Sequence, residues 1–141
     1  MKKFFRLIDA NLNRSREGLR VVEDISRFIL NDKKLTRSFK SLRHGLSAER
    51  KKIDLERLPL LESRNVKRDV GKKSTLREKS RKNIRDVFRA NTERVKESLR
   101  VLEEITKLFD KKMSQRFKRM RFRLYEFEKK SRRKLDVILH S

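Results

Sequence analysis

The sequence lacks cysteine and tryptophan, and it has only three glycines and one proline among 141 residues. Without cysteine, disulfides, thiolate zinc sites and cysteine nucleophiles are all excluded. So few turn-forming residues cannot separate many short strands, which favours helices. No apolar stretch approaches the roughly 18 residues of a membrane span, and Arg6 and Asp9 interrupt the apolar start that a signal peptide needs. We therefore expect a helical, cytoplasmic protein without a membrane partner.

The chain is strongly basic. It has 43 Lys and Arg and 20 Asp and Glu, which gives a net charge of +23. Only 35% of the residues are apolar. The length fits a single domain with a thin, elongated core, which excludes a large two-layer α/β enzyme. Such a charge attracts polyanions, so nucleic acid is a candidate partner, and residues 116–134 hold ten Lys or Arg against two Glu. The alternative is a charge-rich surface of the kind favoured in thermophiles.

An internal repeat is the strongest pattern in the chain. Residues 9–25 (DANLNRSREGLRVVEDI) and 89–105 (RANTERVKESLRVLEEI) are identical at nine of 17 positions, at an offset of 80. Further on, residues 39–43 (FKSLR) align with 117–121 (FKRMR) at an offset of 78. Each copy is predicted to be a helix, a short turn and a second helix. The fold class that follows is all-α: an antiparallel four-helix bundle of two repeated hairpins with pseudo-twofold symmetry.

The first copy is expected over residues 4–55 of a single domain spanning 1–141. Its first helix should run from about Phe4 to Leu30 and end at the turn formers Asn31 and Asp32, and its second helix should follow from about Lys33 to Leu55. The connecting loop is placed at 56–73, because it contains the only proline, Pro59, and Gly71.

The second copy is expected over residues 74–137. Its first helix should begin near Ser74, a plausible N-cap, and reach Phe109. A turn at 110–114 should lead into the last helix, which continues to about Val137.

Apolar residues recur at intervals of three and four in all four segments, which is typical of helices with one buried face. In the first and third helices this stripe turns polar and small, at Asn11, Ser15 and Gly18 and at Asn91 and Ser98. One interpretation is a polar pocket between the repeated helices, and the other is that Asn11 and Asn91 bond each other to fix the helix register. The stripes are Phe4, Ile8, Asn11, Ser15, Gly18, Val22, Ile25 and Ile29; Leu35, Phe39, Leu42, Leu46 and Ile53; Ile84, Phe88, Asn91, Val95, Ser98, Leu102, Ile105 and Phe109; and Met113, Phe117, Met120, Leu124 and Phe127.

Charged residues are repeated as well. Each copy carries a Glu, an Arg and a Glu at steps of three, which suits either a surface ion-pair ladder or a functional cluster. In an antiparallel hairpin, a further arginine of the second helix should lie near the same level. Four arginines and several carboxylates would then meet near the middle of the bundle: Glu17, Arg20, Glu23 and Arg43 with Glu97, Arg100, Glu103 and Arg121.

Arginine is well suited to grip phosphate with two parallel hydrogen bonds, and a carboxylate can hold Mg²⁺ or accept a proton. Segment 64–73 (RNVKRDVGKK) adds Arg68 and Asp69. It lacks the glycine spacing of a Walker A loop, so a phosphate-binding loop and an ordinary basic linker both remain open.

These motifs resemble those of a known family. DANLNRSREGLRVVED at 9–24, FKSLRH at 39–44, RNVKRDVG at 64–71, RANTERVKESLRVLEE at 89–104 and FKRMRFRLYEFE at 117–128 are similar to the small monofunctional hydroxymethylpyrimidine-phosphate kinase, a domain often fused to thiamine-phosphate synthase. The resemblance covers about residues 6–128, with the motifs in the same order.

The resemblance implies an enzyme, a kinase that uses ATP and Mg²⁺ to phosphorylate 4-amino-5-hydroxymethyl-2-methylpyrimidine phosphate to its diphosphate in thiamine biosynthesis. Thiamine-phosphate synthase is then an expected pathway partner, and a homodimer is one state that the sequence allows. Arg14, Arg20, Arg43, Arg68, Arg94, Arg100 and Arg121 would bind phosphates, Asn11 and Asn91 the pyrimidine, and Asp9, Glu17, Asp69 and Glu97 would serve catalysis, with Asp9 and Asp69 as metal ligands.

Two departures from the family pattern limit this transfer. Asn65 stands where the family has Asp, and Arg89 occupies the position that Asp9 holds in the first copy, so the two halves cannot supply identical sites. The charge of +23 also keeps a basic helical nucleic-acid-binding protein as the alternative. A third interpretation is a structural interaction module with a dry core.

Overall fold

The computed structural model describes residues 2–56 and 80–140, and it contains helices and no strand in these ranges. The helices are α1 (Lys2–Asp24), α2 (Lys33–Glu56), α4 (Ile84–Thr106) and α5 (Lys111–Leu139), and a π-helical turn, η1 (Ile25–Ile29), continues α1. The prediction of an all-α four-helix bundle is confirmed. None of the helices in the described ranges carries an apolar stretch that could span a bilayer.

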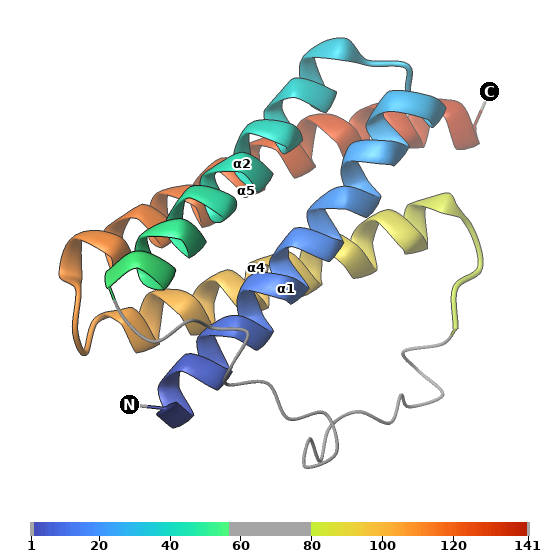
Figure 1. Cartoon of the computed structure of the whole chain (residues 1–141). Coiled ribbons are helices and arrows are strands. Elements are labelled where there is room, and N and C mark those ends of the chain that lie inside the picture. Colours follow the sequence, from blue (N-terminus) through green and yellow to red (C-terminus); the bar gives the residue numbers. More distant parts are fainter. Residues whose placement is uncertain (1, 57–79, 141) are drawn as a thin grey trace.

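The helices form two layers (Figure 1). In that view α1 and α2 run in opposite directions, as do α4 and α5, while α1 lies along α4 and α2 lies above α5. Contacts between α1 and α4, within each helix pair, and between α2 and α5 join all four helices around one core. Each helix therefore needs one broad apolar stripe, which is what the sequence supplies.

The predicted stripes form this core. Every stripe residue of α2 is buried, and the Phe39 ring packs edge-on against Phe88 and Phe127 at centroid distances of 6.2 and 5.9 Å. The predictions fail at the two ends of the first helix, where Phe4 and Ile29 are exposed while Phe5 and Ser26 are buried. At Ile29 the reason is η1, because a π-helical turn is wider than an α-helical one and changes the angular spacing of its side chains.

The first turn lies where the sequence places it. The Leu30 amide donates to the Ile25 carbonyl, Asn31 takes a left-handed backbone with φ of 52°, and Asp32 caps α2 by accepting from the Leu35 amide at 2.9 Å. Lys134 of α5 also binds the Asp32 carboxylate. The Leu35 amide and Lys134 lower the pKa of Asp32 below its usual value, because both favour the charged form.

The bounds of the second copy differ from the predicted ones. Residues 80–83 are not helical, and α4 begins at Ile84, because the Asn83 side chain accepts from the Asp86 amide at 2.9 Å and caps the helix. Likewise α5 begins at Lys111 and not after Ser114, because Asp110 accepts from the Met113 amide at 3.0 Å. The predicted N-cap Ser74 and most of the connecting loop at 56–73, with Pro59 and Gly71, lie outside the described residues.

Small residues bring α1 and α4 close together. The hydroxyls of Ser15 and Ser98 are 2.6 Å apart and share a hydrogen bond, and Gly18 faces Val95. The two contacts are equivalent by the internal repeat, because an offset of 80 relates Ser15 to Val95 and Gly18 to Ser98. The two contacts therefore lie around the centre of an antiparallel helix pair.

Gly18→Ala should destabilise the bundle by about 2 kcal/mol, because it overpacks this contact. A Cβ at position 18 would lie 2.6 Å from Val95 Cγ2 and 3.0 Å from the Asn91 carbonyl oxygen. Gly45→Ala is the matched control, since its Cβ would meet only the flexible end of Met120, and we expect it to be near neutral. Urea unfolding of both variants measures the difference, and equal midpoints would contradict the close contact.

Candidate functional site

A buried carboxylate lies between two arginines in the first hairpin. Glu23 accepts from Arg43 Nε at 3.0 Å and from Arg43 Nη2 at 3.4 Å, and Arg20 Nη1 lies 3.8 Å from its other side. Glu23 is buried and Arg43 is mostly buried, whereas Arg20 reaches into solvent. The carboxylate therefore fixes one arginine between α1 and α2 and leaves the other free to move.

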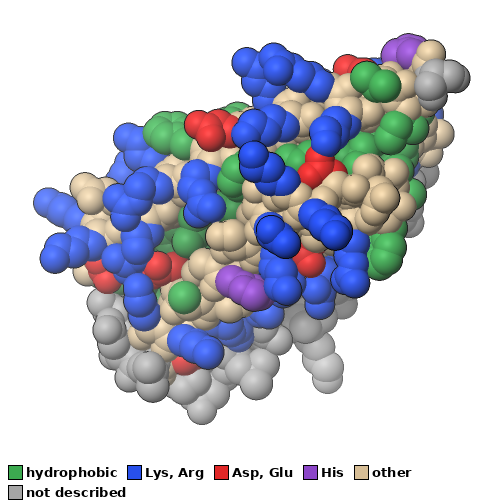
Figure 2. Space-filling model, turned by 90° about the horizontal axis from the view of Figure 1, so that it is seen from above, with side chains coloured by type: hydrophobic (Ala, Val, Ile, Leu, Met, Phe, Trp, Pro, Cys, Tyr) green, Lys and Arg blue, Asp and Glu red, His purple; other side chains and the backbone are tan. Residues whose placement is uncertain are grey.

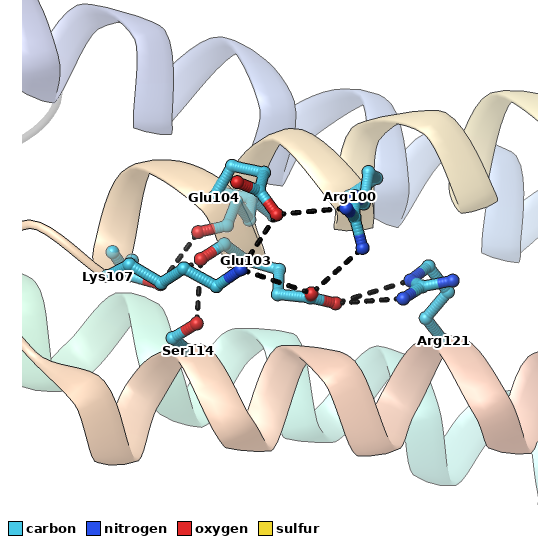
Figure 3. A network of polar contacts seen from close by, with 8 residues as sticks. Arg100, Glu103, Glu104, Lys107, Ser114 and Arg121 are labelled. Carbon is cyan, nitrogen blue, oxygen red and sulfur yellow. Dashed lines mark hydrogen bonds and ion pairs between the residues drawn. The ribbon is translucent and has the colours of Figure 1, made fainter.

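The second hairpin repeats this cluster (Figure 3). Glu103 accepts from Arg121 Nη2 and from Arg100 Nη1, each at 3.1 Å, and its backbone carbonyl accepts from the Ser114 hydroxyl. Arg100 also binds Glu104 at 3.1 Å. Burial opposes the charge of Arg121, but its hydrogen bonds to Glu103 and Tyr125 outweigh this and raise the pKa of Arg121 further.

The four arginines expected to meet near mid-bundle are thus organised as two clusters, one in each hairpin. Arg20 and Arg43 share Glu23, and Arg100 and Arg121 share Glu103. The sequence spacing correctly predicts that each pair lies at one level. Glu23 and Glu103, which the sequence analysis placed in the repeated Glu/Arg set without a catalytic or binding role, are both buried.

The first hairpin is hollowed beside its cluster. A depression of about 410 Å³ is lined by Asn13, Arg16, Glu17, Arg20 and Arg43. Three arginines therefore face a single lining carboxylate. The Nε atom of Arg16 is buried and has no hydrogen-bond partner among the described residues. A buried donor without a partner is destabilising by about 1 to 3 kcal/mol.

The corresponding positions of the second hairpin have their own acidic partners. Lys96, the counterpart of Arg16, binds Glu93 at 2.7 Å and Glu128 at 2.8 Å. Burial opposes the charge of Lys96, yet these two carboxylates together raise its pKa above the usual value. By the repeat offsets, Glu93 and Glu128 correspond to Asn13 and Arg50. The first hairpin thus has an asparagine and an arginine where the second has the two acids that bind Lys96.

This asymmetry could have been read from the sequence. Aligning the two copies position by position shows Asn13 opposite Glu93 and Arg50 opposite Glu128. The sequence analysis used one changed position, Arg89 opposite Asp9, and did not include Asn13 or Arg16 in the predicted site. It also missed the bidentate pair of Glu49 with Arg116, whose Nη2 lies 3.0 Å from the carboxylate and joins α2 to α5, because no local spacing connects these residues.

The two repeated asparagines do not bond each other. Asn11 Nδ2 donates to the Leu7 carbonyl and Asn91 Nδ2 to the Val87 carbonyl, each at 2.8 Å within its own helix. The antiparallel contact around Ser15 and Ser98 places residue 11 opposite residue 102, which is about 16 Å along α4 from residue 91 at 1.5 Å per residue. The alternative of an asparagine pair across the axis is therefore wrong, and the serines make that bond instead.

Asp9 is buried and accepts from Arg50 Nη1 at 3.2 Å. Its carboxylate thus neutralises an arginine between α1 and α2. Within residues 2–56 and 80–140, no group of three or more acidic or histidine side chains could enclose a metal ion. The predicted metal ligand Asp69, and Arg68 beside it, lie outside the described residues.

The remaining predicted residues lie on the outside of the bundle. Arg14 and Glu17 of α1 and Arg94 and Glu97 of α4 are exposed. Of these four, Glu17 lines the hollow. The structure therefore collects Glu17, Arg20 and Arg43 from the predicted set at one place.

The chain is similar to known proteins over most of its length. The profile of the ThiD2 family matches residues 6–130. Proteins named thiamine-phosphate synthase are similar over most of the chain: 41% identity over 124 residues in Synechocystis sp., 40% over 125 in Nostoc sp. and 39% over 121 in Rhodopirellula baltica. These matches cover 87%, 88% and 85% of this chain but only 34%, 34% and 32% of the relatives, so the chain spans about a third of their length. No solved structure matches the chain.

Glu103→Gln should lower the free energy of unfolding by about 3 kcal/mol, because it leaves the charge of Arg121 buried without its counter-charge. Glu104→Gln removes a neighbouring carboxylate that is 45% exposed, compared with 3% for Glu103, and should change stability much less, because exposed ion pairs contribute little. Chemical denaturation at neutral pH compares the two variants. A similar loss in both would show that burial of Glu103 does not matter.

Proposed function

The chain belongs to the ThiD2 family, and from this premise we propose that it acts in thiamine biosynthesis by phosphorylating 4-amino-5-hydroxymethyl-2-methylpyrimidine phosphate to the diphosphate with ATP. The observation that carries the proposal is the hollow of the first hairpin, where three arginines face one lining carboxylate and Arg16 Nε has no partner. A phosphate monoester supplies the acceptors and the negative charge that this hollow lacks.

In this reaction the protein itself forms no covalent bond to the substrate. The attacking group is an oxygen of the substrate phosphate, which is largely deprotonated at pH 7 because its second pKa is about 6. It forms a bond to the γ-phosphorus of ATP while the bond from that phosphorus to the β,γ-bridging oxygen breaks, and ADP leaves. No general base is required, so the protein must mainly position two polyanions and neutralise their charge.

The residues of the hollow suit these tasks in different ways. Arg43 is held by Glu23 and gives a fixed donor, whereas Arg20 is exposed and can close over the bound phosphate. Asn13 accepts from Arg50 at 3.5 Å through Oδ1, which leaves its amide hydrogens to contact the aminopyrimidine. We assign these roles in place of Asn11 and Asn91, whose amides donate within their own helices.

Mg²⁺ commonly binds one or two carboxylates together with substrate phosphates. Glu17 is the one carboxylate that lines this hollow, so it fits such a role there. An ion held by Glu17 would neutralise part of the negative charge on the phosphates as the new bond forms.

A basic surface favours a second candidate function, binding of single-stranded nucleic acid. Figure 2 shows Lys and Arg side chains over much of one face, with few acidic side chains among them. On α5 the exposed rings of Phe122 and Tyr125 lie among cations, with Lys118 Nζ 5.7 Å from the Phe122 ring centre. Exposed aromatic rings beside cations can stack the bases of a single strand while the cations bind its phosphates.

Kinase activity is tested directly by incubating the purified protein with ATP, Mg²⁺ and the pyrimidine monophosphate and measuring the diphosphate. Arg16→Ala should reduce kcat/KM at least tenfold, since it removes a phosphate ligand, while Lys118→Ala on α5 should leave it unchanged. Thermal unfolding of both variants controls for stability. Absence of turnover by the wild-type protein would remove the kinase proposal.

The nucleic-acid function predicts the opposite ranking of the same variants. Fluorescent single-stranded RNA should bind with an affinity that falls steeply with salt, and Lys118→Ala and Phe122→Ala should weaken binding several-fold. Arg16→Ala should have no effect. Binding that survives loss of both Lys118 and Phe122 would exclude α5 as the site.

A further inference from the structure

A second, larger hollow lies at the turn of the first hairpin. It has a volume of about 520 Å³ and is formed by η1, the turn and the first half of α2. This volume is within the range of pockets for small ligands, about 300 to 1,000 Å³. Apart from Glu23 and Lys40, its residues belong neither to the repeated motifs nor to the proposed phosphate site.

Four cations line this hollow: Arg27, Lys33, Arg37 and Lys40. All four are exposed, and none has an ion pair with an acidic side chain in the described ranges. The two carboxylates of the same hollow already have partners, since Glu23 binds Arg43, and Asp32 binds the Leu35 amide and Lys134. The hollow therefore carries an uncompensated charge that suits a ligand with several negative charges.

An aromatic ring is exposed at the same place. Phe28 belongs to η1, lines the hollow and is 68% exposed, and the Arg27 guanidinium lies 5.0 Å from its ring centre. A π-helical turn is rare and occurs frequently at functional sites. An exposed ring beside several cations combines a stacking surface for a base with ligands for phosphates, which are the two parts of a nucleotide.

The two hollows of the first hairpin share one ion pair. Glu23 lines the larger hollow, and its partner Arg43 lines the smaller one. Arg27 lies one helical turn beyond Glu23, and Lys40 lies nearly one turn before Arg43. Lys40 is therefore toward the end of the larger hollow that adjoins the phosphate site, whereas Arg27 lies against the Phe28 ring and Lys33 is near the turn.

We propose that the larger hollow binds a nucleoside triphosphate, with the base on Phe28 beside Arg27 and the polyphosphate running past Lys33 and Arg37 toward Lys40. The polyphosphate then ends near the Glu23–Arg43 pair, which the two hollows share. This placement rests on the proposed kinase function for its acceptor, but the binding of nucleotide itself can be measured without it.

The absence of tryptophan makes a direct binding experiment available. Phe28→Trp introduces a single tryptophan on the proposed base site, and Leu108→Trp is the matched control, because Leu108 is the repeat counterpart of Phe28 and is 67% exposed. Titration of Phe28→Trp with ATP should change its fluorescence saturably, whereas Leu108→Trp should not respond. Saturable responses of equal affinity in both variants would overturn the site.

Competition separates the base from the phosphates. Phe28→Ala should weaken ATP binding about tenfold and leave the binding of inorganic tripolyphosphate unchanged, while Lys40→Ala should weaken both ligands. No effect of Phe28→Ala on ATP would overturn the placement of the base. Saturable binding at Phe28 without turnover would reject the kinase function and keep the nucleotide site, whereas turnover with an unchanged KM for ATP in Phe28→Ala would do the reverse.

Discussion

The close contact of α1 with α4 is the constraint on which the rest of the structure depends. Ser15, Gly18 and Ser98 are small, so the two helices approach until Gly18 meets Val95 and the two serines share a hydrogen bond. This contact fixes the register of the helix pair, and the remaining buried faces of α1 and α4 then take α2 and α5. The small, polar stretch of the apolar stripe is therefore explained by packing, and the hollow lies on the neighbouring face between α1 and α2.

Duplication supplies one framework twice, and a few substitutions give the two copies different electrostatics. Both hairpins keep a buried glutamate between two arginines, which holds their helices together. Only the second hairpin has two further acids, Glu93 and Glu128, which bind Lys96. The cations around the hollow of the first copy therefore lack the acidic partners that Lys96 has in the second copy, so this hollow can attract an anionic ligand.

Periodicity and caps explain how much of this was predictable. The stripes through Phe39 and Val95 identify the core, and Asn31 with Asp32 identify the first turn, because both signals are local in sequence. The position of the polar side chains was harder to predict, since Asn11 can satisfy its amide within its own helix as well as across the bundle. Glu49 and Arg116 are 67 residues apart, so only the packing of α2 on α5 reveals their pair. The site required the comparison of positions that differ between the copies, above all Asn13 and Arg50.

The unpartnered Arg16 also offers a physical basis for selecting a phosphorylated substrate. On the proposed function, a phosphate in the hollow gives the Arg16 side chain a counter-charge and acceptors, whereas the unphosphorylated alcohol leaves Arg16 without either. The penalty for an unsatisfied buried donor is about 1 to 3 kcal/mol, and it is larger for a charged group. Discrimination then arises mainly from the unfavourable state with the wrong substrate, in addition to attraction for the right one. The second hairpin shows the contrast, because Lys96 already binds two carboxylates and would gain little from a phosphate.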